Sequence, residues 1–299
     1  MSFANAYRGA KAAAVRSVAI AGLALALAGC ETVASLNPFG RGETYEPEIV
    51  ETRPAAELYN EGLSLIDRGQ YQTAAERFEE IEEAYPFSDF ARRALIMQAY
   101  AQFAGGAYDD SAGTAQRYLQ LYPSQESADY AQYILAMSNF NQIPDITRDQ
   151  TRTAQALRGF QELIDRYPNS DYVEDARAKI VFAEDQLAGK EMEVGRFYLE
   201  RRNYTGAINR FRTVVASYQT TRHSEEALAR LTEAYMAMGI VDEAQTAAAV
   251  LGHNFPESQW YRDSYALLQS GGLEPRENRE SWISRAFRGF TRAVVGVGG

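Results

Sequence analysis

The sequence predicts an all-α protein, a solenoid of about five stacked helix pairs, and two observations lead to this fold class. Apolar residues follow helical spacing from Ala55 to Leu268. Aromatic–proline pairs interrupt this spacing in steps of 37, 45, 51 and 37 residues, at Tyr85-Pro86, Tyr122-Pro123, Tyr167-Pro168, the degenerate Tyr218-Gln219 and Phe255-Pro256. A period in this range indicates stacked helical hairpins.

Each unit is compared with the tetratricopeptide template, which has a small residue where two helices cross, an aromatic and a small residue in the second helix, and a proline beyond it. The first, fourth and fifth units follow it closely. The second unit is the weakest, with Ser111 and Ala115 at its small and aromatic positions, and the third carries a polar insertion at residues 139–150. The matching residues are Gly62, Tyr71, Ala74, Phe78 and Pro86 in unit one, Gly195, Tyr198, Tyr204, Ala207, Phe211 and Val214 in unit four, and Tyr235, Gly239, Ala244, Leu251 and Pro256 in unit five.

A solenoid of this kind buries a continuous core between neighbouring units and leaves one curved face free to hold other chains. Phe78, Phe160 and Phe211 recur at one position of the second helices. We therefore predict that these three rings lie in the core and do not contact ligands.

The N-terminus has the pattern of a lipoprotein signal peptide. Three basic residues precede an apolar run over Ser17–Ala28, which leads to Cys30, the only cysteine in the chain. The run is shorter than the roughly 20 residues that a membrane-spanning helix needs, and it ends in small residues, as cleaved leaders do. We predict a signal peptide at residues 1–29 and a palmitate-bearing, lipidated Cys30. The alternative is a signal peptide that stops near a buried cysteine.

Two further segments flank the repeats. Residues 30–54 are rich in proline, glycine and acids, which predicts a flexible, lipidated tether. Residues 269–299 form a tail in which Trp282, Ile283 and Phe287 recur at helical spacing among arginines, which predicts an amphipathic helix. This helix would lie on lipid or in a partner's groove, or it would fold back and cap the last repeat.

Composition excludes several kinds of partner and reaction. The formal net charge of −10 becomes −13 once the three basic residues of the signal peptide are removed, which argues against nucleic acid as a partner. The two histidines, His223 and His253, lie on different repeats without a second ligand at metal-binding spacing. The sequence also lacks nucleophile and phosphate-loop motifs. We predict a protein that is not an enzyme, with no catalytic residue, metal site or cofactor.

Several longer segments resemble one family. They are Tyr85-Pro86-Phe87-Ser88, the Arg148-Asp149-Gln150 insertion, Arg166-Tyr167-Pro168-Asn169-Ser170, the run from Gly189 to Tyr198, and Ala207-Ile208-Asn209-Arg210-Phe211. With the lipidation motif and the repeats, they resemble the BamD family, the D-subunit lipoproteins of the β-barrel assembly machinery of the bacterial outer membrane. The likeness is to alphaproteobacterial members, and it spans residues 30–268.

The resemblance implies a lipoprotein on the periplasmic face of the outer membrane, where it helps insert and fold β-barrel proteins as scaffold and substrate receptor. It implies that the first repeats bind unfolded outer-membrane proteins and that later repeats dock the POTRA modules of the central barrel subunit, beside other accessory lipoproteins. Carried over, this assigns substrate binding to Tyr85 and partner docking to Arg210. Tyr85 also precedes a terminating proline, so a structural role stays open, and Arg210 stays open as a solvated arginine.

Two other classes of protein are considered beside this one. A tetratricopeptide lipoprotein of another envelope system, such as a secretin pilotin or a cell-division coordinator, would share the lipidation motif and the repeats but would lack the Arg148-Asp149-Gln150 insertion. A peptidoglycan hydrolase would need a separate compact domain around a catalytic glutamate, and no segment of this sequence is left over to form one.

Overall fold

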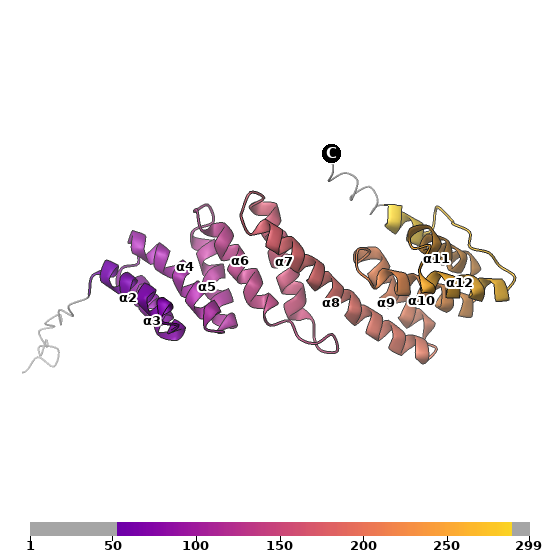
Figure 1. Cartoon of the computed structure of the whole chain (residues 1–299), viewed down its shortest axis with the longest axis horizontal. Helices are drawn as coiled ribbons and strands as arrows, with labels where there is room; N and C mark the ends of the chain where they lie inside the picture. The colour runs from indigo at the N-terminus through magenta and orange to yellow at the C-terminus, as the bar shows by residue number, and fades with distance from the viewer. Residues whose placement is uncertain (1–52, 289–299) are drawn as a thin grey trace, which may run out of the picture. The chain divides into compact units, whose positions relative to one another are not determined.

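The computed structural model describes residues 53–288, which form helices and connecting turns without a strand (Figure 1). Within these residues ten helices form five consecutive pairs, and a further helix, α12, follows them, which confirms the predicted fold class. Residues 1–52, with the predicted signal peptide, Cys30 and most of the tether, lie outside the described part. The pairs are α2 (Ala55–Asp67) with α3 (Tyr71–Ala84), α4 (Asp89–Ala104) with α5 (Tyr108–Leu121), α6 (Ala128–Phe140) with α7 (Thr151–Arg166), α8 (Val173–Glu200) with α9 (Tyr204–Ser217), and α10 (Ser224–Ala237) with α11 (Val241–Asn254), and α12 spans Gln259–Ser270.

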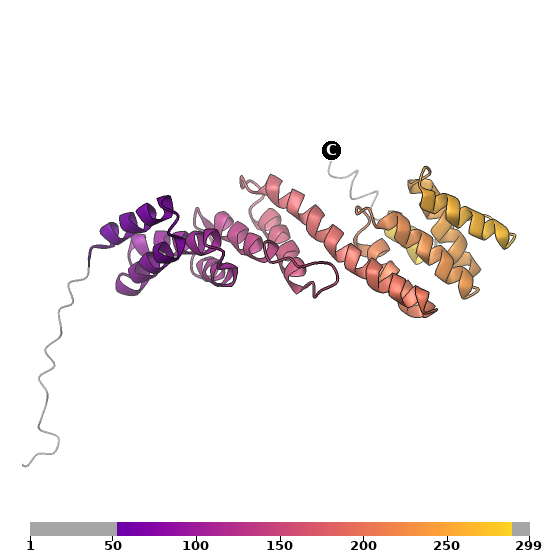
Figure 2. The same ribbon diagram turned by 60° about the horizontal axis from the view of Figure 1, so that its bottom comes forward.

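The helices stack in chain order. From α2 to α11 each helix packs mainly against the helix before it and the helix after it, whereas α12 packs more against α10 than against α11 (Figure 1, Figure 2). The core therefore consists of contacts between neighbours along the chain, as in other solenoids. Phe78, Phe160 and Phe211 are completely buried, which confirms the prediction that these rings lie in the core.

Two glycines allow the helices of a pair to cross closely. A Cβ atom at Gly62 would lie 2.6 Å from the ring of Phe78, and one at Gly195 would lie 2.4 Å from the ring of Phe211. Carbon atoms in van der Waals contact stay about 3.5–4.0 Å apart. Only glycine fits at these crossings, so the small residue of the template has a direct steric cause.

One helix is longer than the repeat pattern predicts. α8 runs for 28 residues. Its N-terminal half packs on α7, where Ala176 joins the core cluster of Phe160, and its C-terminal half crosses α9 at Gly195. No proline occurs between Val173 and Glu200, so nothing in the sequence breaks the helix. The 51-residue step between aromatic positions reflects this single long helix.

In four of the five helix pairs the turn between the two helices contains one residue in the left-handed conformation. Gly69, Gly106 and Gly239 take this position with φ of 72°, 81° and 71°, whereas the fourth pair has Arg202 with φ of 58°. A non-glycine residue there loses about 1–2 kcal/mol through contact between its Cβ and the backbone. The greater chain entropy of glycine in the unfolded state offsets part of this difference.

Arg202→Gly is therefore expected to raise the free energy of unfolding by up to about 1 kcal/mol. Urea unfolding followed by circular dichroism measures this change. Arg201→Gly is the control, because Arg201 has φ of −87° and gains nothing from glycine. Equal or lower stability of Arg202→Gly would contradict the steric explanation.

The described part of the tail folds back on the last helix pairs. Residues 282–288 are helical, and Ile283 and Phe287 are buried against residues of α9, α10 and α11. The indole N–H of Trp282 donates to the hydroxyl of Tyr235 at 3.2 Å. Three uses were considered for the tail: contact with lipid, contact with a partner's groove and capping of the last repeat. Residues 282–288 take the capping one, and residues 289–299 lie outside the described part.

Candidate protein-binding surfaces

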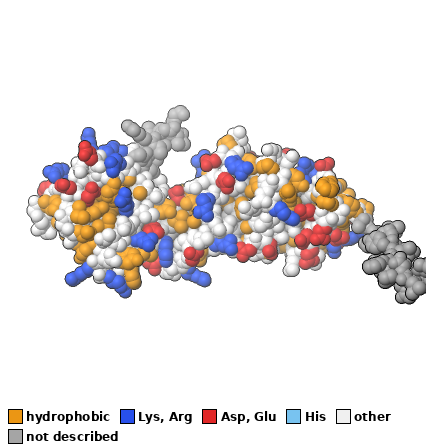
Figure 3. Space-filling view, turned by 180° about the vertical axis from the view of Figure 1, so that it is seen from behind, with side chains coloured by type: hydrophobic (Ala, Val, Ile, Leu, Met, Phe, Trp, Pro, Cys, Tyr) orange, Lys and Arg blue, Asp and Glu red, His pale blue; other side chains and the backbone are white. Residues whose placement is uncertain are grey.

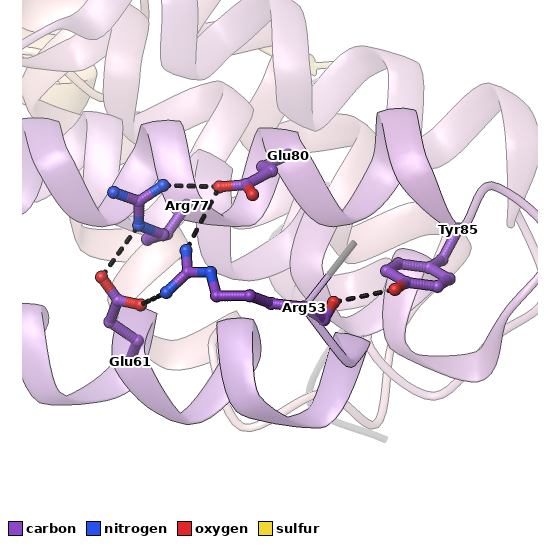
Figure 4. Close-up of polar contacts among 5 residues, drawn as sticks. All are labelled: Arg53, Glu61, Arg77, Glu80 and Tyr85. Atoms are coloured by element: carbon purple, nitrogen blue, oxygen red, sulfur yellow. Dashed lines mark hydrogen bonds and ion pairs between the residues drawn. The ribbon is translucent and has the colours of Figure 1, made fainter. Parts of the chain in front are cut away.

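Tyr85 lies at the end of the first helix pair in sequence, and in space it lies beside the segment that leads into this pair. It follows the last residue of α3, and its backbone N–H donates to the carbonyl of Ile81. Its phenol O–H donates to the main-chain carbonyl of Arg53 at 2.8 Å (Figure 4). Its ring is partly buried and packs on the core of the first pair. Tyr85 thus joins the end of α3 to the segment that leads into α2, which favours the structural role that the sequence left open.

Two arginines and two glutamates form a connected charge cluster beside this contact (Figure 4). Arg53 Nη1 lies 2.6 Å from Glu61 Oε2, and Arg53 Nη2 lies 3.7 Å from Glu80 Oε2. Arg77 binds the same two carboxylates at 2.9 Å and 2.5 Å. Hydrogen bonds from Arg53 and then from Arg77 lower the pKa of Glu61. Because exposed ion pairs add little stability, the cluster acts chiefly by orienting the segment before α2.

Phe87 has the most exposed large apolar side chain among residues 53–288, and its ring is fully exposed in the turn between α3 and α4. Ser88 defines this turn, because its hydroxyl donates to the carbonyl of Tyr85 at 2.9 Å and accepts from the N–H of Ala91 at 3.1 Å. An exposed ring on an ordered turn is a ready contact for an apolar group of another chain. Phe87 belongs to the Tyr85-Pro86-Phe87-Ser88 segment that carries the family resemblance, but it was not predicted as a site residue; the available signal was an aromatic residue between a proline and a helix cap.

The surface of the first helix pair is acidic. α3 exposes Glu76, Glu79 and Glu83, and Figure 3 shows acidic side chains gathered over this pair. A polypeptide that binds here meets negative charge as well as an apolar ring. Electrostatic complementarity therefore favours apolar or basic segments over acidic ones.

Arg210 lies on α9 in the fourth helix pair, directly before the buried Phe211. Its side chain is 44% exposed, and its Nη1 lies 3.2 Å from Oε2 of Glu191 on α8. The arginine is thus partly exposed beside the core, and its ion pair is within the chain. It borders a polar hollow of about 370 Å³, which suits a hydrogen-bonding or acidic group of another protein. The other residues that line the hollow are Tyr198, Asn203, Gly206, Asn209 and Thr213.

The structure does not bring Tyr85 and Arg210 together, because they belong to the first and fourth helix pairs. His223 directly precedes α10, and His253 lies in α11. Between residues 53 and 288, no group of three or more histidine, cysteine or acidic side chains is arranged to hold a metal ion. No helix in this range is long and apolar enough to cross a membrane.

Comparison with known proteins gives one consistent family. A family model described as an outer membrane lipoprotein, YfiO, matches residues 51–251. The chain is 45% identical over 235 residues to the outer membrane protein assembly factor BamD of Caulobacter vibrioides, covering 78% of this chain and 77% of that protein. It is 42% identical over 217 residues to BamD of Rickettsia prowazekii, covering 73% and 86%. A solved tetratricopeptide-repeat protein of Thermus thermophilus matches with a TM-score of 0.33 and 18% identity over 72% of this chain and 98% of that one.

Proposed function

Because the chain belongs to the BamD family of outer membrane lipoproteins, we propose that it is the lipoprotein of the β-barrel assembly machinery that receives unfolded outer-membrane proteins. The observation that carries this proposal is 45% identity to an outer membrane protein assembly factor over 78% of the chain. Five helix pairs support it, since such a solenoid works by holding other chains. A secretin pilotin or a cell-division lipoprotein is not favoured, because neither would carry the Arg148-Asp149-Gln150 insertion.

The proposal assigns different partners to different parts of the chain. Cys30 carries the lipid and anchors the protein to the periplasmic face of the outer membrane. The first helix pair receives a strand of an unfolded barrel protein beside Tyr85 and Phe87, and Arg210 docks the POTRA modules of the central barrel subunit. These two surfaces belong to the first and the fourth helix pairs, which supports simultaneous binding of the substrate and the central subunit.

Arg210→Glu is expected to reduce recovery of the central barrel subunit by more than about tenfold, because a like-charge contact in an interface costs several kcal/mol. The measurement is a detergent pull-down from the native envelope with tagged full-length protein, followed by quantitative mass spectrometry. Arg117→Glu is the matched control, since Arg117 is 47% exposed and forms an ion pair with Glu82 away from the fourth helix pair.

The pull-down also tests the proposed function. Equal recovery of the barrel subunit by Arg210→Glu and Arg117→Glu would show that docking uses another surface of the same protein. Recovery of a secretin or a division protein by the unaltered chain, without any POTRA-bearing protein, would instead support a lipoprotein of another envelope system.

Phe87→Ala and Tyr85→Phe separate the two aromatic residues of the first helix pair. If the exposed ring captures an incoming strand, Phe87→Ala is expected to weaken peptide binding by up to about tenfold, the value of an aromatic contact. Tyr85→Phe keeps the aromatic ring and loses the hydrogen bond from the phenol to the Arg53 carbonyl, so its affinity for the peptide is expected to stay close to that of the unaltered chain. Fluorescence anisotropy of a labelled C-terminal strand peptide measures both. The opposite ranking would assign the contact to Tyr85.

A further inference from the structure

The insertion of the third helix pair, residues 141–150, is a compact loop with its own hydrogen bonds. The N–H of Thr147 donates to Asp145 Oδ1 at 2.9 Å, and the Gln150 side chain donates to the carbonyl of Asp145 at 3.0 Å. Asp149 Oδ1 accepts from the N–H of Thr151, the first residue of α7, at 2.9 Å. These bonds explain why Asp149 and Gln150 occur in the motif, and they give the loop a defined shape.

This loop packs on the middle of α8. Lys190 Nζ donates to the main-chain carbonyl of Thr147 at 2.9 Å. One residue earlier, Gly189 faces Ile146, because a Cβ at this glycine would lie 3.6 Å from Ile146 Cγ2. The insertion therefore reaches beyond its own helix pair.

The same part of α8 also receives the turn between α9 and α10. A Cβ at Gly189 would lie 3.2 Å from Nε2 of His223, the residue before α10. One α-helical turn earlier, Asp185 Oδ2 lies 2.9 Å from Nη2 of Arg222. Gly189 thus lies between Ile146 of the third pair and His223, which leads into the fifth pair, and the absence of a side chain makes room for the close approach of His223.

α8 connects the first three helix pairs to the rest of the fourth and fifth pairs, because its N-terminal half packs on α7 and its C-terminal half packs on α9. Glycine in a helix interior is less favourable than alanine by about 1 kcal/mol, and α8 contains two glycines, Gly189 and Gly195. Gly195 is packed on the ring of Phe211, so the helix would bend most easily near Gly189. We propose that the 141–150 loop and the 220–223 turn form a brace around Gly189. The brace fixes the angle between the first three and the last two helix pairs, and with it the separation of Phe87 from Arg210. This inference holds whichever partners bind.

Distances between two spin labels test the brace. Gln120 on α5 and Ala266 on α12 are exposed and lie on the two sides of Gly189 along the chain. The full chain in detergent carries Gln120→Cys and Ala266→Cys, with Cys30→Ser to remove the only native thiol. An intact brace gives one narrow distance distribution by pulsed electron paramagnetic resonance. Lys190→Ala combined with Ile146→Ala is expected to broaden this distribution and to add populations at other distances.

Two controls make the result decisive. Arg201→Ala removes a positive charge beside the C-terminal end of α8, where Arg201 contacts Phe197 and not the brace. A second label pair, Glu79→Cys with Gln161→Cys, lies within the first three helix pairs. The distance between these two labels is expected to stay unchanged unless the repeats themselves unfold.

An unchanged 120–266 distribution in the double variant would overturn the brace. If the distance of the second label pair also changes, the single variant Lys190→Ala decides, because it leaves Ile146 itself in place and removes the hydrogen bond to Thr147. A broader 120–266 distribution in this variant supports the brace, and an unchanged one overturns it. The readout involves no partner protein, so its failure would leave the proposed function unaffected.

Discussion

Phe211→Ala is expected to lower the free energy of unfolding by about 3–5 kcal/mol, as is typical when a fully buried aromatic ring is removed from a close-packed core. Phe211 is completely buried in the cluster that joins α8, α9, α10 and α11. Gly195 brings α8 directly onto its ring and has no side chain that could fill the space left by the ring. Urea unfolding followed by circular dichroism measures the loss.

The contact between Gly195 and Phe211 also predicts that the effect of Gly195→Ala on the free energy of unfolding differs in sign between the unaltered chain and Phe211→Ala. In the unaltered chain, Gly195→Ala puts a methyl carbon 2.4 Å from Cε1 of Phe211, which is expected to cost about 1–3 kcal/mol through overpacking. In Phe211→Ala the ring is absent, and Gly195→Ala is then expected to stabilise the protein by up to about 1 kcal/mol, because alanine is the better helix former.

Gly113→Ala is the matched control for this cycle. A Cβ at Gly113 on α5 would meet no atom within 4 Å, and the residue is exposed. It is therefore expected to gain up to about 1 kcal/mol in both backgrounds. If Gly195→Ala proved as harmless as Gly113→Ala in the unaltered chain, close crossing of α8 and α9 would not be the reason for the glycine.

The helix pairs were predictable from sequence because their contacts recur within each hairpin. Gly62 and Phe78 meet inside the first pair, and Gly195 and Phe211 repeat the same contact in the fourth. The continuity of α8 was not predicted, since a repeat template describes each pair separately and does not indicate that one helix serves two neighbours. The tail stayed ambiguous for a related reason: an amphipathic pattern requires an apolar partner but does not identify it.

The surfaces were predictable only in part. Arg210 is partly exposed, as a charged residue directly before a core phenylalanine is expected to be, but its ion pair with Glu191 joins two helices. The hydrogen bond from Tyr85 to Arg53 likewise joins residues at opposite ends of the first pair. Such contacts depend on how helices pack, so no local pattern encodes them. The exposure of Phe87 depends on the path of a turn, which the repeat template leaves undefined.

Cys30→Ser is expected to abolish attachment of the purified protein to neutral lipid vesicles. Each buried methylene contributes ~0.8 kcal/mol, and two or more acyl chains on one residue anchor a protein stably where one chain binds only marginally. The comparison uses chains that begin at residue 30, one acylated at Cys30 and one with Cys30→Ser produced behind an ordinary secretory leader, so that neither retains the apolar signal peptide. Flotation with vesicles measures attachment in the absence of any partner protein.

The lipid composition of the vesicles separates the proposed anchor from other sources of membrane affinity. Arg285 and Arg288 are exposed on the capping segment, and basic side chains attract anionic lipid by about 1 kcal/mol each near the surface. If the Cys30→Ser chain floats only with anionic vesicles, the tail adds an electrostatic contact and the acyl chains remain the anchor. If it floats with neutral vesicles as fully as the acylated chain does, membrane attachment does not depend on Cys30, and the proposed anchor is wrong.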